Sequence, residues 1–477
     1  MTLSPKPLIS CEHCGSIFRR HELQHGETAT CARCGTILWR YSGISVSGWL
    51  ALSLAALIVF AIANAYPVIS MSVQGMTREA SLLTAVIMTW DQGYVWTAMM
   101  TGLAGFALPF LHLIILVWVL WPLALGREPA GLRPAVRLLG ILRPWCMVPV
   151  FLLGVLVSVV KLAGMASVSP APGLYAFGAL VVLLATLERL SPHALWRYVE
   201  KAGVTPVHVP RPAPGQTLTG CHVCGQVQAV PVPDGSSSSH EPYHVHAIDH
   251  QHEGDSHHCV RCNAIVHARK PQSLTRTWAL LVAAAALYVP ANVLPIMNIQ
   301  SLFLGDSGHT ILGGVVELWQ TGSWDIALIV FIASIVVPLT KMLALAILAG
   351  SVQRESQFNL RQRTRLYEMV EFIGQWSMLD VFVVILLASL AHFQGLMEIS
   401  AGPAAGAFGL VVILTMLAAM SFDPRLAWDL ETHESDETNE ASNTAIASRR
   451  AQDPSDHEAP SMTHTGTGPV ASRHDTA

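Results

Sequence analysis

Charged side chains are scarce in this chain, and several long stretches have none. Only 13% of the 477 residues are Asp, Glu, Lys or Arg, too few to cover the surface of a soluble protein of this length. Charges are missing altogether from five stretches, 41–77, 92–126, 162–187, 277–305 and 399–422. Helices around a soluble core would carry charges on their outer faces, so a large soluble core is excluded. An apolar helix of about twenty residues spans a bilayer, and we therefore expect an α-helical polytopic membrane protein.

Other absences narrow the class of function. The formal net charge is −4, and no basic stripe alternates with aromatic residues, which argues against a nucleic-acid partner. The chain contains no Walker-type phosphate loop, no Gly-x-Ser-x-Gly elbow and no His-Glu-x-x-His zinc helix. We therefore expect a protein that is not an enzyme, so that a partner or an ion gradient would drive any work it does.

The apolar stretches predict eight transmembrane helices, four in each half of the chain. We place them near 48–66, 97–122, 144–167, 173–190, 278–297, 325–349, 374–394 and 404–421. Two connecting loops, 123–143 and 350–373, carry four arginines each, whereas the loops on the opposite side contain a single basic residue, Arg78. Because Lys and Arg concentrate in cytoplasmic loops, both termini and the linker between the halves are expected in the cytoplasm.

The two halves of the chain repeat one another. The motif Asn-x-x-Pro at 64–67 recurs at 292–295, and Trp-x-Met at 145–147 recurs at 376–378. Between these landmarks, Pro109 matches Pro338 in nearly the same register. Since each half has an even number of expected spans, the copies are parallel rather than inverted repeats.

Eight of the nine cysteines form four Cys-x-x-Cys knuckles. The two-residue gap lets both thiolates face one tetrahedral Zn²⁺, and two knuckles complete the four ligands. Gly follows three knuckles and Asn263 follows the fourth, and both residue types tolerate a left-handed turn. We therefore predict two structural Zn²⁺ sites, with ligands Cys11, Cys14, Cys31 and Cys34 in the first and Cys221, Cys224, Cys259 and Cys262 in the second.

The cysteines allow other interpretations. Disulfides conflict with the expected cytoplasmic placement, where thiols stay reduced. A redox role for Cys-x-x-Cys is possible, but paired knuckles favour closed, non-catalytic zinc sites. Cys146, the ninth cysteine, is expected at the start of the third helix, where we interpret it as inert packing.

With the zinc sites placed, the sequence predicts two homologous four-helix transmembrane modules, each preceded by a small cytoplasmic β-type zinc ribbon. The parts are a first ribbon at 1–43, a first module at 44–200, a second ribbon at 201–274, a second module at 275–422 and a tail at 423–477. The tail is polar and rich in Asp, Glu, Ser, Thr and His, so we expect it to be disordered. Seven histidines within 240–258 suggest either a metal sensor or buffer or, as we favour, a variable insertion in the second ribbon.

Two charged residues lie inside expected membrane helices. A charge at the centre of such a helix costs about 2.5–3.5 kcal/mol on insertion scales, so Lys341 and Asp380 each need a reason. They fall at similar depth on sequential helices, and Ser334, Ser377 and Thr415 supply hydroxyls near that level. We predict an intramembrane polar site that either gates a path by protonation or locks three helices together.

The alternative is that Lys341 snorkels to the head groups and that Asp380 caps a helix. In the first module His112 and Pro149 occupy the positions of Lys341 and Asp380. Only the second module is therefore expected to carry the acid.

These features together resemble the paraquat-inducible protein A family. The shared features are the order ribbon, four spans, ribbon, four spans, together with Cys-x-x-Cys-Gly, Ala-Asn-x-x-Pro, Trp-Ser-Met-x-Asp-Val-Phe at 376–382 and Val-Pro-Leu-Thr-Lys at 337–341. The resemblance covers 11–421. It implies a multi-pass protein of the bacterial inner membrane that loads or extracts phospholipids for a periplasmic tunnel protein with mammalian-cell-entry (MCE) domains and contributes to envelope integrity. It also places Lys341 and Asp380 in the motifs of the family's second-module polar site.

Two other functions remain open from the sequence. One is a secondary transporter of small ions or metals that uses the His-rich loop as a sensor. The other is a purely structural anchor that recruits the tunnel protein to the membrane.

Overall fold

The structure is a computed structural model that describes most of the chain. It covers residues 7–21, 23–73, 76–163, 167–203, 210–231, 257–267, 269–301, 305–320, 322, 324–354, 359–374, 382–383, 397–429 and 473–474. The expected helix near 374–394 lies almost wholly outside these residues. The same holds for most of the His-rich insertion and most of the tail.

Long apolar helices dominate the described residues. Six are long and apolar enough to cross a membrane, at Val46–Ala65, Val95–Ala124, Leu132–Val159, Ser273–Val293, Ala327–Gln353 and Pro403–Asp429. A seventh candidate is α7 (Pro172–Leu187), which a 62° bend separates from α8 (Pro192–Lys201). The expectation of a helical, multi-pass membrane protein is confirmed, whereas the count of eight spans stays a prediction.

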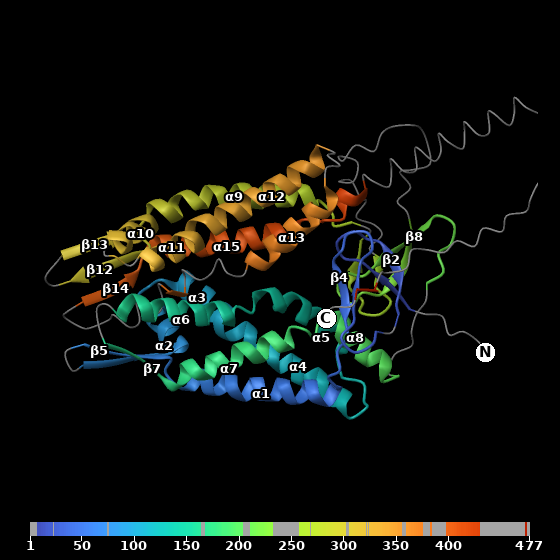
Figure 1. The fold of residues 1–477 in the computed structure, drawn as a ribbon, viewed down its shortest axis with the longest axis horizontal. Coiled ribbons are helices and arrows are strands. Elements are labelled where there is room, and N and C mark those ends of the chain that lie inside the picture. Colours follow the sequence, from blue (N-terminus) through green and yellow to red (C-terminus); the bar gives the residue numbers. More distant parts are fainter. Residues whose placement is uncertain are drawn as a thin grey trace, which may run out of the picture.

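The helices form two bundles that lie lengthwise beside each other (Figure 1). The first half of the chain supplies α1 (Val46–Ala65), α2 (Leu82–Asp91), α3 (Val95–Gly102), α4 (Leu108–Ala124), α5 (Leu132–Leu142), α6 (Val148–Ala163), α7 and α8. The second half supplies α9 (Ser273–Val293), α10 (Ile311–Gln320), α11 (Trp324–Phe331), α12 (Val337–Gln353), α13 (Leu360–Gly374) and α15 (Pro403–Ser421). The cysteine-containing segments lie together at one end of both bundles, which we call the ribbon end.

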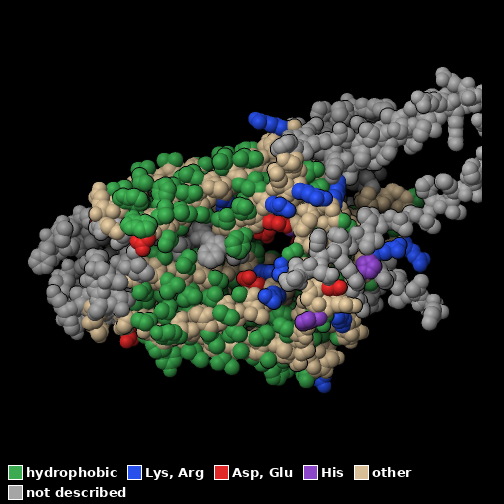
Figure 2. Space-filling model, in the orientation of Figure 1, with side chains coloured by type: hydrophobic (Ala, Val, Ile, Leu, Met, Phe, Trp, Pro, Cys, Tyr) green, Lys and Arg blue, Asp and Glu red, His purple; other side chains and the backbone are tan. Residues whose placement is uncertain are grey.

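Apolar side chains cover the outside of both bundles (Figure 2). Large ones are well exposed, among them Trp118 (62%), Val182 (67%) and Leu343 (62%). A soluble protein rarely leaves so much contiguous apolar surface open to water, whereas lipid tails solvate it. Lys and Arg side chains gather toward the ribbon end in the same view.

The repeat is visible in the helical geometry. A π-turn at Leu103–Ala107 precedes Pro109 in α4, and a π-turn at Ile332–Val336 precedes Pro338 in α12. Proline has no N–H and its ring clashes with the carbonyl of residue i−4, so the preceding turn widens to i→i−5 bonding. The amide of Leu108 accordingly donates to the carbonyl of Leu103.

Two small antiparallel sheets close the opposite end, which we call the sheet end (Figure 1). The first has the strand order β6-β5-β7 and the second β13-β12-β14. Their strands are β5 (Ile69–Val73), β6 (Met76–Ala80), β7 (Ser167–Pro170), β12 (Met297–Ser301), β13 (Gly305–His309) and β14 (Met397–Ala401). The sequence analysis did not predict these sheets, because strands of four or five residues carry too little alternation to be recognised.

Each sheet sits where the first and last helices of its module meet. A Cβ at Gly173, near the start of α7, would lie 2.5 Å from the carbonyl oxygen of Pro67 after α1. A Cβ at Gly402, before α15, would lie 2.1 Å from the carbonyl oxygen of Pro295 after α9. Both distances are far below contact, so the absence of a side chain permits the same close approach in both modules.

Three amphipathic helices also differ from the expectation. The sequence analysis treated the segments of α5 and α13 as loops and did not foresee α8. The third expected helix, placed at 144–167, begins at Val148 after a 3₁₀ turn at Arg143–Trp145. At such interfacial positions a polar face masks the apolar one in a hydrophobicity scan, whereas the arginines remain visible as a topology signal.

Candidate metal centres and intramembrane polar site

The first cysteine cluster is built from two small hairpins. Strand β1 (Leu8–Ser10) pairs with β2 (Ile17–Arg19), and β3 (Thr28–Thr30) pairs with β4 (Ile37–Arg40). The knuckles turn at Gly15 and Gly35, whose φ angles are +75° and +85°. Each glycine amide donates to the carbonyl of the first cysteine of its knuckle.

The second cluster repeats this construction. Strand β8 (Gln216–Gly220) pairs with β9 (Val227–Pro231), and β10 (His257–His258) pairs with β11 (Ile265–Val266). The knuckles turn at Gly225, with φ of +69°, and at Asn263, with φ of +57°. The expectation that Asn263 takes the left-handed turn in place of glycine is confirmed.

In each cluster four sulfur atoms converge. The Sγ atoms of Cys11 and Cys34 lie 3.5 Å apart, as do those of Cys14 and Cys31. The Sγ atoms of Cys221 and Cys262 are 3.6 Å apart, and those of Cys224 and Cys259 are 3.5 Å apart. All eight side chains are buried, and within each cluster the ligand atoms lie within 4.8 Å of one another.

These distances fit a metal better than a disulfide. A disulfide would bring two sulfurs to about 2.05 Å, and all nine cysteines are free thiols. Four sulfurs around a tetrahedral metal at about 2.3 Å are about 3.8 Å apart, close to the observed separations. Hydrogen bonding from Cys14 lowers the pKa of Cys11, and hydrogen bonding from Cys221 lowers that of Cys259, which favours the thiolate form that binds metal.

The N-terminal ribbon packs against the end of the second module. Trp428 is buried against the first cysteine cluster. The guanidinium of Arg33, inside the Cys31–Cys34 knuckle, lies 5.0 Å from the Trp428 ring and donates to its backbone carbonyl at 3.1 Å. Trp428 in turn donates from Nε1 to Thr364 of α13 at 3.1 Å.

The second ribbon packs in the same way against the first module. The guanidinium of Arg261, inside the Cys259–Cys262 knuckle, lies 5.4 Å from the ring of Trp196 on α8. Arg261 also forms an ion pair with Glu200, which Arg20 of the first ribbon shares at 3.0 Å. Each ribbon therefore contacts the module that does not follow it directly in sequence.

The sequence analysis missed this crossed arrangement. A signal was present, because both C-terminal knuckles read Cys-x-Arg-Cys and both modules end in a segment with one tryptophan. Its meaning depends on which module each ribbon meets, and that information is not local. The two ribbons also touch one another, since a Cβ at Gly220 would lie 2.4 Å from the Cβ of Ser10.

Lys341 is buried inside the second module. Its side chain is only 2% exposed, and its Nζ has no hydrogen-bond partner among the described residues. A Cβ at Gly374 would lie 3.2 Å from that Nζ and 3.9 Å from Met416. The ammonium group thus lies where α12, the C-terminus of α13 and α15 meet, and the helix-dipole charge of α13 there favours a cation.

The other residues of the predicted polar site divide into two groups. Ser334 and Thr415 are buried and donate to carbonyls of their own helices, Val330 at 2.6 Å and Val412 at 2.9 Å. Asp380 and Ser377 lie outside the described residues. The burial of Lys341 speaks against snorkelling, and the pairing with Asp380 stays a prediction.

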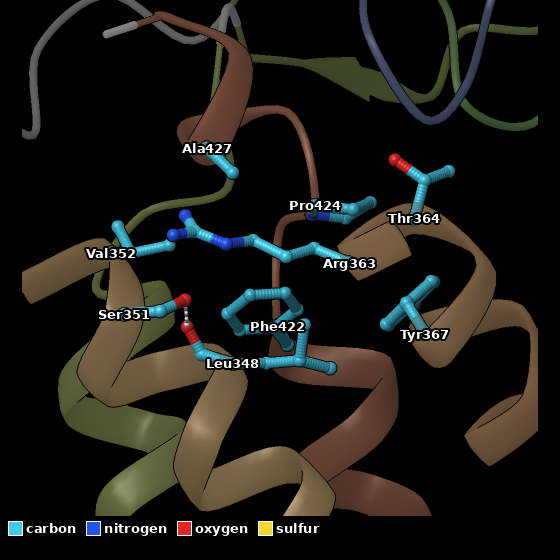
Figure 3. Close-up of a pocket in the computed structure, with 9 residues that line it drawn as sticks. All are labelled: Leu348, Ser351, Val352, Arg363, Thr364, Tyr367, Phe422, Pro424 and Ala427. Carbon is cyan, nitrogen blue, oxygen red and sulfur yellow. Dashed lines mark hydrogen bonds between the residues drawn. The ribbon is translucent and has the colours of Figure 1, made fainter. Parts of the chain in front are cut away.

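A small cavity lies near the ribbon end of the second module (Figure 3). The side chain of Arg363 extends across it from α13 toward Val352 on α12. Its Nη1 is buried without a hydrogen-bond partner among the described residues. The lining consists of Leu348, Ser351, Val352, Arg363, Thr364, Tyr367, Phe422, Pro424 and Ala427.

Comparison with known proteins matches nearly the whole chain. The family model described as paraquat-inducible protein A matches residues 46–200 and 274–431. Intermembrane transport protein PqiA of Escherichia coli is 34% identical over 435 residues, 88% of this chain and 95% of that protein. Lipophilic envelope-spanning tunnel protein A of Escherichia coli is 31% identical over 427 residues, 89% of this chain and 91% of that protein. A probable intermembrane transport protein of Haemophilus influenzae is 29% identical over 91% of this chain. No solved structure matches the chain.

Proposed function

Because this chain belongs to the paraquat-inducible protein A family, we propose that it is the inner-membrane component of an intermembrane lipid transport system. The observation that carries the proposal is the similarity over about nine-tenths of the chain to proteins named for intermembrane transport and for an envelope-spanning tunnel. The apolar surface of both bundles agrees with a membrane component. In this role the chain moves lipids and is not an enzyme.

The proposal includes an orientation and a partner. The ribbon end, rich in Arg, faces the cytoplasm together with both termini, and the sheet end faces the periplasm. A periplasmic MCE-domain tunnel protein would then meet the sheet end. Phospholipids pass between the bilayer and this partner.

We assign zinc to the two cysteine clusters. Four thiolates without an open position suit a structural Zn²⁺, and the sulfur separations fit its tetrahedral geometry. The metal would hold the hairpins of each ribbon together, and Arg33 and Arg261 would then hold the ribbons on the modules.

Within the membrane we assign the coupling role to Lys341 and Asp380. A buried ammonium group with no partner among the described residues needs a counter-charge, and the sequence offers Asp380 at a similar depth. Protonation of this pair would change the charge of the second module's interior during lipid movement.

The substitutions Lys341→Met and Asp380→Asn test this role, because both remove charge while nearly conserving shape. We expect each to lower lipid transfer from proteoliposomes to the tunnel partner by at least tenfold at unchanged expression. Lys201→Met, at the exposed end of α8, is the matched control and should transfer normally. Full transfer by both pair variants would refute the coupling role, and absence of transfer by the wild type with its partner would refute the function.

A further inference from the structure

A second cavity lies in the first module, at the counterpart of the predicted polar site. Its lining consists of His112, Arg143, Cys146, Pro149, Leu184 and Glu188. By the repeat, His112, Cys146 and Pro149 correspond to Lys341, Ser377 and Asp380. The Ala-Phe-Gly motif at 176–178, repeated at 407–409, places Leu184 opposite Thr415.

The cavity has kept one positive and one negative residue although the positions have changed. Arg143 corresponds to Gly374, the residue whose missing side chain leaves room for the Lys341 ammonium. The two modules therefore bring a cation to the same place from different elements. Pro149 replaces the acid, but Glu188, directly after α7, lines the cavity instead.

The polar groups of this cavity are incompletely satisfied. Nδ1 of His112 is buried without a hydrogen-bond partner in the described part of the chain. Arg143 donates from Nη2 to the backbone carbonyl of Glu188 at 2.6 Å. No carboxylate among the described residues forms an ion pair with Arg143, so this cation can still accept an anion.

The depth of the cavity is that of a lipid head group. Glu188 follows the 16-residue helix α7 and lies about 24 Å along its axis from the sheet end. His112 lies about 25 Å from the start of α3 by the same measure. The hydrocarbon core is about 30 Å thick, so both helices bring the cavity to the boundary at the ribbon end, beside apolar Leu184 and Pro149.

We propose that this cavity binds the head group of a phospholipid that carries both a phosphate and an ammonium group, as phosphatidylethanolamine does. The phosphate meets Arg143 and Nδ1 of His112, the ammonium meets Glu188, and the acyl chains leave over Leu184 into the bilayer. The proposal rests on the proposed lipid-transport function and adds the class of lipid and its entry point from the cytoplasmic leaflet.

Cys146 provides a native probe, because its thiol lines the cavity. The rate of its alkylation by N-ethylmaleimide is measured by peptide mass spectrometry on the full-length protein in detergent. Dioleoyl-phosphatidylethanolamine, dioleoyl-phosphatidylglycerol or inorganic phosphate is added in separate arms. We expect phosphatidylethanolamine to slow alkylation at least tenfold and inorganic phosphate to have no such effect.

Variants separate the two charges. Arg143→Gln should lose protection by both lipids, whereas Arg143→Lys should restore part of it. Glu188→Gln should lose protection by phosphatidylethanolamine but keep protection by phosphatidylglycerol, which has no ammonium group. Arg133→Gln, on the exposed side of α5, is the matched control and should behave as the wild type.

Three results would overturn the proposal. They are no protection by either lipid, unchanged protection in both Arg143→Gln and Glu188→Gln, or equal protection by inorganic phosphate. Lipid transfer measured on the same preparations separates this outcome from the larger function. Transfer without protection removes only the cavity, whereas protection without transfer leaves a lipid site and removes the transport role.

Discussion

At the residue scale, the knuckle turns show most clearly how sequence dictates geometry. A left-handed turn costs a side-chain-bearing residue about 1–2 kcal/mol, and the chain places Gly at three such turns and Asn at the fourth. This part of the site could be predicted from the sequence because the constraint is local. Cys spacing, turn residue and ligand geometry all lie within five residues.

Gly35→Ala isolates this backbone effect. A Cβ at Gly35 meets nothing within 4 Å, yet φ is +85°, so the expected loss is backbone strain alone. We predict a metal affinity of the first cluster about 5–30-fold lower, measured by competition with a chelator. Gly43→Ala, where φ is not positive and a Cβ makes only an ordinary contact at 3.5 Å, should bind metal as the wild type does.

At the element scale, the repeat predicted the helices well and the connecting elements poorly. Residues 46–65 and 403–421 lie within a few residues of the expected helices, because long apolar runs set them. The sheets at the sheet end depend on pairing between strands as distant as β5 and β7, and no local pattern records such pairing. The crossed contacts of Trp196 and Trp428 are non-local for the same reason.

Gly402→Ala should disrupt the second module. The added methyl would lie 2.1 Å from a backbone carbonyl of Pro295, and backbone cannot move aside as a flexible side chain would. We expect a thermal midpoint lower by at least 5 °C, or loss of folded protein, in scanning fluorimetry of the purified protein.

Gly406→Ala is the matched control for that experiment. This glycine lies inside α15, and its Cβ would make only an ordinary contact with Thr97 at 3.6 Å. Because Ala favours a helix over Gly by about 1 kcal/mol, the control should be as stable as the wild type or more so. Equal behaviour of the two variants would contradict the packing described for α9 and α15.

At the scale of the whole molecule, the crossed ribbons join the two modules. Trp428 of the second module is buried on the first ribbon, and Trp196 of the first module lies under Arg261 of the second ribbon. Neither module can then move far at the ribbon end without a change in a ribbon contact. The arrangement predicts that each tryptophan stabilises the ribbon encoded in the other half of the chain.

Trp428→Ala should therefore loosen the first ribbon. Truncating a buried Trp costs about 3–5 kcal/mol, so amide hydrogen exchange at 7–40 should become at least a hundredfold faster, whereas 216–231 should change little. Trp196→Ala should show the reverse pattern. Trp96→Ala, 67% exposed near the sheet end, should leave both ribbons unchanged. Loosening confined to the ribbon of the same half would contradict the crossed contacts.

The metal content of the purified full-length protein tests the central claim most directly, because both ribbons and their contacts with the modules depend on filled clusters. Inductively coupled plasma mass spectrometry should find two zinc ions per chain in the wild type. It should find one in Cys34→Ser and one in Cys262→Ser, and two in Cys146→Ser. A wild-type protein with intact helices but no stoichiometric metal would contradict the account.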